Sequence, residues 1–444
     1  MAKRTKKIQD SSWIYSFLRN YTDLALKLSY RTIKYVGRDR IPKDGAVIYA
    51  PNHTNALMDA MVILALDRKP KVFVARADIF RNPKIAKILA FFKILPIMRM
   101  RDGIDEVRKN NETIEKAVDV LRDKVPFCIF PEGTHQAKYS SLPLSKGIFR
   151  IALQAQELMP DMPLYIVPVG LRYGNFFRFR STARVAIGEP INVGEFVAEH
   201  SELSTAEQIN VMKENLDERM KETIFYIPND ENYDAKYDIC AAVVRKQVRK
   251  LRGDSTLGKL RGLDAHFEAN KRTLQRIDDI ETQNPELYKK LIDLGNKASV
   301  LRKQEQISLS SVFVRHHTLV RILRRLLFIV SLPYTIPASI LTLPMTFACK
   351  AIFTKLKDYA FRNSVRYFIN LIMWPLLMII YAILAYVFLP WQWALPLTLA
   401  ILPAPIIAHE IYRLVRILKS DIKLHMNKEL RGYYTRINEI IFNK

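Results

Sequence analysis

The fold is decided by one short stretch, AVIYAPNHTNALMD, residues 46–59. It opens with an apolar run typical of a buried strand and passes into an apolar segment with helical character, residues 56–66. Between the two lies His53, with Asp59 six positions later. A neutral histidine that a carboxylate holds in one tautomer is a common general base, able to deprotonate a hydroxyl for attack on an activated carbonyl. A surface histidine beside a helix N-terminus explains the same pair, so other segments of the chain must decide between the two interpretations.

The strand-then-helix pattern repeats across residues 38–225 and predicts an α/β domain. Apolar runs rich in Val, Ile, Phe and Tyr indicate strands at 46–50, 71–77, 126–130, 164–171 and 183–187. Helices are expected near 55–67, 82–92, 104–122 and 146–158. This alternation predicts a mixed, mainly parallel sheet flanked by helices, with functional loops at the strand ends. Pro168 inside its run favours an edge strand or a turn.

Two flanking regions have helical spacing. Residues 11–37 combine Trp13, Phe17 and further apolar side chains with interspersed basic ones, which predicts an amphipathic helix. Such a helix suits a membrane interface, although packing on its own domain explains it equally well. We therefore assign 1–37 as a membrane-interface segment. Residues 226–314 are strongly charged and predict a helical insertion without evident chemistry.

Residues 315–444 carry the membrane signal. The runs 326–348 and 368–389 contain no charged side chain and are long enough to span a bilayer, whereas 393–408 is shorter. Basic residues flank the first run on both sides, and three prolines interrupt it. The charge distribution predicts that 326–348 is re-entrant or interfacial, that 368–390 and 393–408 form a spanning hairpin, and that a basic tail follows. We expect an inner-membrane or equivalent location, with the site facing the cytoplasm.

Net charge points to an acidic partner. The formal charge is +25 and the sequence pI is near 9.8. Nucleic acid and anionic membrane surface are the usual candidates. The basic residues gather beside the apolar runs, so anionic lipid is the expected partner and nucleic acid is not. The three cysteines are too few and too scattered for a disulfide framework or a zinc site.

Two further motifs could bind an anionic substrate. The turn Phe130-Pro131-Glu132-Gly133-Thr134 ends an apolar run, and its glycine allows a ligand to approach the backbone closely. Arg99 and Arg101 follow another apolar segment and could grip a phosphate, although solvated surface arginines are the commoner case. Either motif alone would favour a structural explanation.

Together, in this order, these motifs resemble the glycerolipid acyltransferases of the PlsC type over about residues 35–215. The resemblance implies that His53 is the general base and that Asp59 orients it. It also implies an acceptor and phosphate site, made of Arg99, Arg101, Glu132, Gly133, Thr134 and Lys146. Neither metal nor cofactor is expected, and the co-substrate would be acyl-CoA or an acyl carrier protein thioester. The acceptor would be a glycerophosphate or lysophospholipid.

The chain departs from the family pattern in two places. Five residues separate His53 from Asp59, where most members have four, and His135 stands where many have arginine after the Phe-Pro-Glu-Gly-Thr turn. The longer spacing leaves the acceptor open between glycerol 3-phosphate, lysophosphatidic acid, another lysolipid and an amino-acid-based lipid. A catalytically silent lipid-binding or scaffold protein on the same fold is the alternative of another class.

Overall fold

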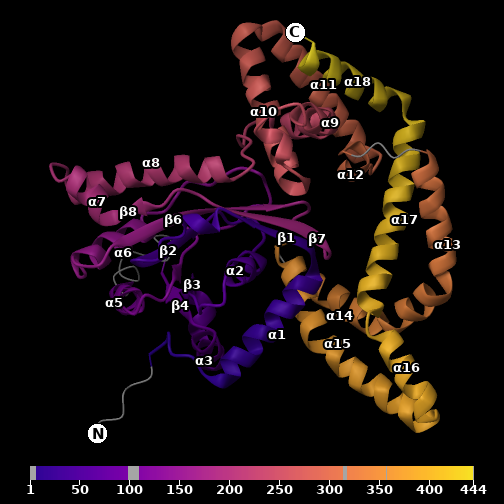
Figure 1. Cartoon of the computed structure of the whole chain (residues 1–444), viewed down its shortest axis with the longest axis horizontal. Helices are drawn as coiled ribbons and strands as arrows, with labels where there is room; N and C mark the ends of the chain where they lie inside the picture. Colours follow the sequence, from indigo (N-terminus) through magenta and orange to yellow (C-terminus); the bar gives the residue numbers. More distant parts are fainter. Residues whose placement is uncertain (1–6, 99–109, 314–317, 357, 444) are drawn as a thin grey trace. The chain divides into compact units, whose positions relative to one another are not determined.

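The computed structural model describes residues 7–98, 110–313, 318–356 and 358–443, and the chain divides into two compact units. The first unit is Met1–Ile224 together with Lys355–Leu371, and the second is Phe225–Thr354 together with Ile372–Lys444. A segment from the C-terminal region therefore belongs to the unit that contains the N-terminal half. Figure 1 shows the elements of both units.

The first unit is built on one eight-stranded sheet. Its strands are β1 Tyr30–Val36, β2 Ala46–Pro51, β3 Val72–Arg76, β4 Ile94–Ile97, β5 Phe127–Cys128, β6 Leu164–Tyr173, β7 Ser181–Ile187 and β8 Ile191–Asn192. The order is β1-β7-β6-β2-β5-β3-β4, and β8 also pairs with β6. β6 runs antiparallel to β7 and β8, whereas the other pairs are parallel. The expected mixed, mainly parallel sheet is confirmed.

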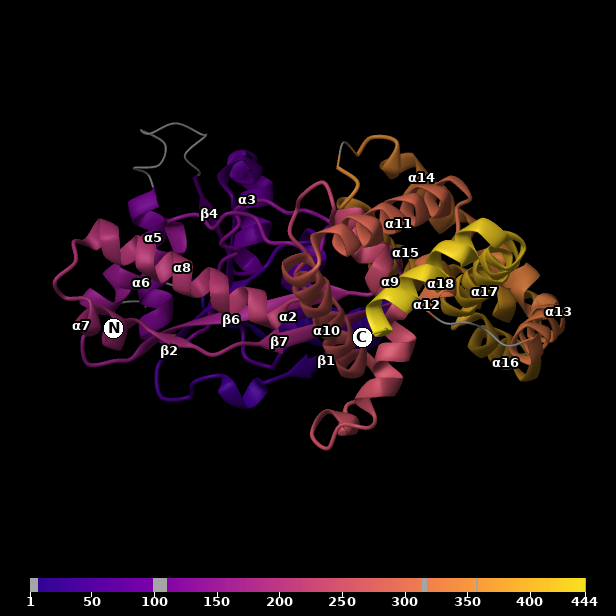
Figure 2. The same cartoon turned by 90° about the horizontal axis from the view of Figure 1, so that it is seen from above.

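Helices cover both faces of this sheet because its central strands are apolar on both sides. The helices are α1 Trp13–Ser29, α2 Leu57–Leu64, α3 Pro83–Phe91, α5 Asn110–Arg122, α6 Gly147–Glu157, α7 Val193–Glu199 and α8 Thr205–Thr223. Ile48 of β2 packs into a core with α5, α6 and α8, whereas its neighbour Tyr49 packs into a second core with α1 and α2. Figure 2 shows α8 lying along β6.

The helix expected over residues 11–37 is shorter than the sequence indicated. It ends at Ser29, and Tyr30–Val36 forms strand β1, which pairs in parallel with β7. The misassigned segment, YRTIKYV, is rich in β-branched and aromatic residues, whose preference for strands outweighed the helical spacing of its basic side chains. β4 and the two-residue β8 are further strands that the apolar pattern did not predict.

The expectation that Pro168 marks an edge strand is wrong. β6 is an interior strand, and Pro168 lies opposite Ala50 of β2. On the other side β8 pairs with Tyr165 and Ile166, and β7 begins to pair at Val169. Pro168 thus falls between the two antiparallel partners. Its carbonyl still accepts a 2.9 Å hydrogen bond from the amide of Gly188.

The second unit is helical. α9 Tyr233–Leu251, α10 Gly262–Gln283, α11 Pro285–Gln304, α12 Leu309–Phe313 and α18 Lys428–Phe442 contribute to one apolar core. Within it the Arg302 guanidinium donates two hydrogen bonds to the Asp238 carboxylate, at 2.7 and 2.9 Å. The hydroxyl of Tyr434 donates a third, at 3.0 Å. Both members of the ion pair are buried.

The C-terminal apolar runs form α13 Thr318–Leu341, α14 Leu343–Phe353, α15 Phe361–Phe388, α16 Trp391–Ile401 and α17 Ala404–Met426. Among the described residues, α15 alone is a single helix long and apolar enough to cross a membrane. The pairs α13–α14 and α16–α17 meet that criterion when each is taken together, and they bend by 54° and 47°. The number of crossings and their orientation stay predictions.

We predict that Arg302→Met lowers the free energy of unfolding of the second unit by about 3–5 kcal/mol, because it leaves the buried Asp238 carboxylate without its partner. Thermal unfolding of the purified full chain measures the change. Replacing both residues, as Asp238→Leu with Arg302→Met, should restore much of the loss.

Lys303→Met is the matched control for this substitution. The neighbouring Lys303 pairs with Asp234 at 2.6 Å, but both side chains are about half exposed. Removing the Lys303 charge should therefore lower the free energy of unfolding by no more than about 1 kcal/mol. Equal losses in the two single variants would show that the buried pair does not stabilise this unit.

Candidate active site

The candidate site lies where strands of the sheet end. His53 follows the last residue of β2, Glu132 follows β5, and Tyr173 is the last residue of β6. These three strands run parallel to one another, so their carboxyl ends meet at one edge of the sheet. This is the edge at which open α/β sheets place their sites.

The side chain of Asn52 fixes the backbone from which His53 projects. Its amide group donates to the carbonyl of Leu171 at 3.2 Å, and its oxygen accepts from the amide of Leu171 at 2.6 Å. The carbonyl of His53 accepts a further hydrogen bond from the amide of Gln136, at 3.1 Å. The histidine is thus tied to β6 on one side and to the loop after β5 on the other.

Asp59 sets the tautomer of His53. Oδ2 of Asp59 lies 2.8 Å from Nδ1 of His53 and also accepts from the amides of Thr54 and Asn55, each at 2.7 Å. Because a carboxylate accepts, the proton of the neutral imidazole resides on Nδ1, and Nε2 is left as the acceptor. Asp59 is 0% exposed. This arrangement is that of a general base with its orienting carboxylate.

The extra residue between His53 and Asp59 is accommodated just before α2. Ala56, the residue preceding this helix, has φ +45° and ψ −130°, a backbone conformation that residues other than glycine rarely adopt. The chain reverses there, and Asp59, in the first turn of α2, points back to the histidine. The sequence analysis expected Asp59 to orient His53 but did not predict the conformation at Ala56 that permits it.

Two buried tyrosines stand behind the carboxylate. The hydroxyl of Tyr173 donates to Oδ1 of Asp59 at 2.7 Å, so both carboxylate oxygens are engaged. Burial raises the pKa of Tyr173 well above its ordinary value, and the charge of Asp59 raises it further. Burial likewise raises the pKa of Tyr30, whose ring lies 5.9 Å from that of Tyr173. Tyr173 therefore stays a donor, a role for which the local sequence contains no signal.

Aromatic rings flank the histidine. The ring of Phe130 stacks on that of His53, with centroids 4.2 Å apart and planes inclined by 26°. The ring of His135 approaches it edge-on, with centroids 5.2 Å apart. The imidazole of His53 is therefore held in one plane, as a proton acceptor has to be if its lone pair is to meet an incoming hydroxyl.

Glu132 is a buried carboxyl group in the turn that follows β5. It is 6% exposed, and neither of its oxygens accepts a hydrogen bond of normal geometry from any residue that the structure describes. Burial raises its pKa to about 8, and the backbone amides of His53 and Leu142 oppose this shift more weakly. A buried polar group of this kind, so close to the His53–Asp59 pair, marks a place where a polar ligand or a further cation would bind.

The structure gives fewer contacts for the other expected site residues. Gly133 has φ +64°, so the turn after Glu132 needs a glycine for its backbone conformation. Thr134 and Lys146 are exposed, and Lys146 immediately precedes α6. Arg99 and Arg101 lie outside the described residues, so their part in the site stays a prediction.

The segment Lys355–Leu371 supplies side chains beside this site that the sequence analysis did not predict. Oδ2 of Asp358 lies 2.8 Å from Nε2 of His135, and the ring of Phe361 stands edge-on to that of His135, 5.5 Å away. Asn363 donates to the hydroxyl of Tyr30 at 3.3 Å. The one available signal was Asp358 itself, a lone acid in a basic stretch between two apolar runs.

No group of three or more His, Cys, Asp and Glu side chains in the described ranges could hold a metal ion. The chemistry that the arrangement itself supports is proton transfer at Nε2 of His53. A substrate hydroxyl placed there would have a buried carboxyl group, Glu132, as its neighbour.

Comparison with known proteins agrees with this geometry. Residues 32–172 match the family model described as Acyltransferase. The chain is 27% identical over 297 residues to Glycerol-3-phosphate O-acyltransferase 2 of Saccharomyces cerevisiae, covering 62% of this chain. It is 26% identical over 151 residues to 1-acyl-sn-glycerol-3-phosphate acyltransferase of Borreliella burgdorferi, covering 34% of this chain.

The chain spans 38% of the length of the yeast relative and 58% of the bacterial one. Among solved structures, it is similar to the 1-acyl-sn-glycerophosphate acyltransferase PlsC of Thermotoga maritima. The identity is 22% and the TM-score 0.31, and the match covers 46% of this chain and 85% of that one.

We predict that Glu132→Gln stabilises the protein more at pH 8.5 than at pH 5. The folded protein holds the Glu132 proton up to about pH 8, whereas the unfolded chain releases it near the ordinary value of 4.5. Stability is therefore lost as pH rises between these values, by at most a few kcal/mol, and the neutral glutamine does not share this loss. The melting temperature of the two proteins at both pH values measures the effect.

Glu157→Gln, at an exposed position at the end of α6, controls for the substitution itself. The Glu132→Gln minus wild-type difference in melting temperature should grow from pH 5 to pH 8.5. A difference that stays constant or shrinks would mean that Glu132 is ionised in the folded protein.

Proposed function

From the match of residues 32–172 to the acyltransferase family model we propose that the chain moves a fatty acyl group from a thioester to a hydroxyl of a glycerophosphate-type acceptor. The observation that carries the proposal is the His53–Asp59 pair at 2.8 Å, with Nδ1 engaged and Nε2 left as acceptor. Phospholipid biosynthesis is the process in which such a transfer belongs.

The chemical step needs one base and a positioned acceptor. Nε2 of His53 takes the proton of the acceptor hydroxyl as its oxygen attacks the thioester carbonyl carbon. The new carbon–oxygen bond forms, the carbon–sulfur bond breaks, and the imidazolium returns its proton to the departing thiolate. Asp59 stabilises the transient imidazolium from the opposite side of the ring. Its oxygens accept from four hydrogen-bond donors, and one of these is the Nδ1–H of His53.

Glu132 is the group proposed to recognise the acceptor. As a buried acid with no partner among the described residues, it can donate to or accept from an acceptor hydroxyl, or meet the cation of an arginine. Lys146 at the start of α6, together with Arg99 and Arg101, is proposed to neutralise the acceptor phosphate, with Gly133 and Thr134 lining the same turn.

Glycerol 3-phosphate and lysophosphatidic acid are the two acceptors to be tested first. The chain matches relatives named for glycerol 3-phosphate and for its 1-acyl derivative, and the match to the former is longer, at 62% of this chain against 34%. Acyl-CoA and acyl carrier protein present the same thioester, so either donor satisfies the chemistry. A panel that crosses both donors with both radiolabelled acceptors, using the purified chain, identifies the reaction.

The proposed enzyme acts at a membrane. α15 is apolar over a length sufficient to span a bilayer, and basic residues precede it within the first unit. We propose that the site faces the cytoplasm, where both thioester donors are found. The net charge of +25 favours a surface of anionic lipid.

His53→Ala is expected to lower turnover by about 10²–10⁴-fold, since a positioned general base contributes a factor of that size. The decrease should appear in kcat, with the KM for the acceptor little changed, because the imidazole acts in the proton-transfer step and not in binding of the acceptor. Initial rates with the active donor and acceptor measure it.

His200→Ala is the matched control. His200 belongs to the same unit, where its ring stacks on Phe196 and its Nδ1 contacts the carbonyl of that residue, remote in function from His53. This variant should keep wild-type turnover. If His53→Ala were as active as His200→Ala, the proposed mechanism would be refuted. No turnover by the wild-type chain with any donor and acceptor of the panel would favour a lipid-binding role without catalysis.

A further inference from the structure

The segment Lys355–Leu371 belongs to the first unit, although the rest of that unit ends at Ile224. It contains the start of α15, a helix long and apolar enough to cross a membrane. Asp358 stands just before this helix. Its Oδ1 accepts a hydrogen bond from the amide of Ala360 at 2.8 Å, so the carboxylate is fixed by its own turn. Its second oxygen, Oδ2, is left to serve a partner from another part of the chain.

That partner is His135, in the loop after β5. Oδ2 of Asp358 lies 2.8 Å from Nε2 of His135, and because an ionised carboxylate only accepts, Nε2 carries the proton. The His135 ring in turn meets the ring of His53, with centroids 5.2 Å apart and planes inclined by 71°. The ring of Phe361, in the same segment, also stands against His135. A first route thus runs from Asp358 through His135 to His53.

A second route leads from Asn363 to Asp59. The side-chain amide of Asn363, in the first turn of α15, donates to the hydroxyl of Tyr30 at 3.3 Å. The side chain of Asn55 donates to the same hydroxyl at 3.5 Å, and its backbone amide donates to Oδ2 of Asp59 at 2.7 Å. The ring of Tyr30 also packs against that of Tyr173, whose hydroxyl donates to Oδ1 of Asp59. Tyr30 therefore connects Asn363 with the supports of both carboxylate oxygens.

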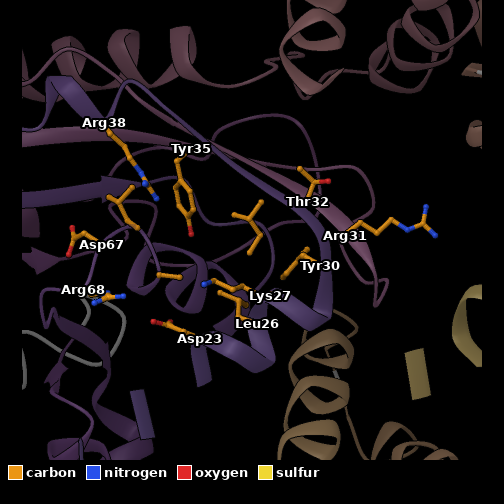
Figure 3. Close-up of a pocket in the computed structure, with 13 residues that line it drawn as sticks. Asp23, Leu26, Lys27, Tyr30, Arg31, Thr32, Tyr35, Arg38, Asp67 and Arg68 are labelled. Atoms are coloured by element: carbon orange, nitrogen blue, oxygen red, sulfur yellow. The ribbon is translucent and has the colours of Figure 1, made fainter. Parts of the chain in front are cut away.

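Packing does not enclose Tyr30 completely. Figure 3 shows Tyr30 among the side chains around a cavity of about 590 Å³, which lies between α1, β1 and the residues after α2. Protein atoms therefore do not press on Tyr30 from that side, and its hydrogen bonds have more weight in fixing it. Asn363 is buried, so water does not compete for its contact with the Tyr30 hydroxyl. Loss of this contact would free Tyr30 to shift toward the cavity.

The two routes reach both members of the catalytic pair from residues only five positions apart in the sequence. One leads to the base and the other to the carboxylate that orients it. The lone pair of Nε2 has to point at the acceptor hydroxyl, and a displacement of about 1 Å can lower a rate by about 10²-fold. Contacts that fix the ring plane of His53 and the position of Asp59 therefore bear on turnover.

We propose that Asp358 and Asn363 are positioning residues for the acyl transfer. Asp358 fixes the plane of His53 through His135, and Asn363 fixes Asp59 through Tyr30. Each acts through a neighbour and not by contact with a substrate. This role rests on the proposed function and goes beyond it, because it places the start of α15 among the supports of the catalytic pair.

The first test replaces Asp358 with asparagine. Asparagine has one oxygen where aspartate has two, so it cannot accept from both the Ala360 amide and Nε2 of His135. We expect Asp358→Asn to lower kcat by about 10-fold, with the KM for the acceptor little changed. Initial rates of the purified full chain with its active donor and acceptor measure both. A raised KM with unchanged kcat would overturn this role, because His135 would then contact the acceptor itself.

Asp78→Asn and Tyr367→Phe are the matched controls. Asp78 is an ion-paired carboxylate of the same unit, with a side chain 39% exposed against 49% for Asp358. Tyr367 is a buried residue of the same segment, and its hydroxyl donates to the carbonyl of Thr22 in α1 at 2.8 Å. Both variants should keep wild-type kcat. Equal losses in Asp358→Asn and Tyr367→Phe would overturn the route through His135, because attachment of the segment alone would explain them.

A double-mutant cycle shows whether Asp358 acts through His135. His135→Phe keeps an aromatic ring beside His53 but removes Nε2. In this background Asp358→Asn should cause no further loss of kcat, because the atom that Asp358 holds is absent. A loss as large as the one in the wild-type chain would overturn the assignment.

Asn363 is tested in the same way through Tyr30. Asn363→Leu removes the amide at nearly the same size, and we expect it to lower kcat by about 10-fold. In a Tyr30→Phe background, which lacks the hydroxyl, Asn363→Leu should have no further effect. Equal losses in the two backgrounds would overturn the role of Asn363.

Turnover of the wild-type chain separates this role from the proposed function. If the wild-type chain is active and both Asp358→Asn and Asn363→Leu match it, the positioning role is overturned and the proposed function stands. If the wild-type chain is inactive with every donor and acceptor of the panel, the proposed function fails and the positioning role falls with it.

Discussion

The first unit depends on one buried charge. Asp59 has no exposed surface, and an ionised carboxylate in such a place is tolerated when donors surround it. Its four donors come from the loop after β2 and from the end of β6. Three features bring these donors and Asp59 together: the adjacency of β2 and β6, the reversal of the chain at Ala56, and the side-chain bridge of Asn52. The strand order of the sheet and the geometry around His53 therefore both depend on surrounding Asp59 with donors.

Two acidic side chains of this site show how environment divides their roles. Asp59 is encircled by donors, whereas Glu132, which is also buried, accepts no hydrogen bond of normal geometry from a described residue and has its pKa raised to about 8 by burial. The structure thus places a fully hydrogen-bonded carboxyl group on one side of His53 and an acid with a raised pKa near it. A bound phosphate would meet less repulsion from this pair than two ionised carboxylates would exert.

The features that the sequence predicted are those that depend on short-range patterns of residues. Strands β2, β3, β6 and β7 and helices α2, α3 and α6 follow from apolar runs and their periods, and the pairing of His53 with Asp59 follows from their spacing before a helix. β1 was missed because its basic residues imitate helical spacing, and the interior place of Pro168 depends on two separate partners of β6. Tyr173 and Asp358 reach the site from 114 and 223 residues away, a distance at which local pattern gives no information.

The return of Lys355–Leu371 to the first unit has a consequence for biosynthesis. The sheet and the His53–Asp59 pair can form once residue 224 has left the ribosome. The wall made by Asp358, Phe361 and Asn363 cannot form until about 150 further residues, including two apolar helices, have been made. Completion of the site is thereby tied in time to synthesis of the C-terminal region, so a nascent chain arrested before residue 355 would hold an unfinished first unit.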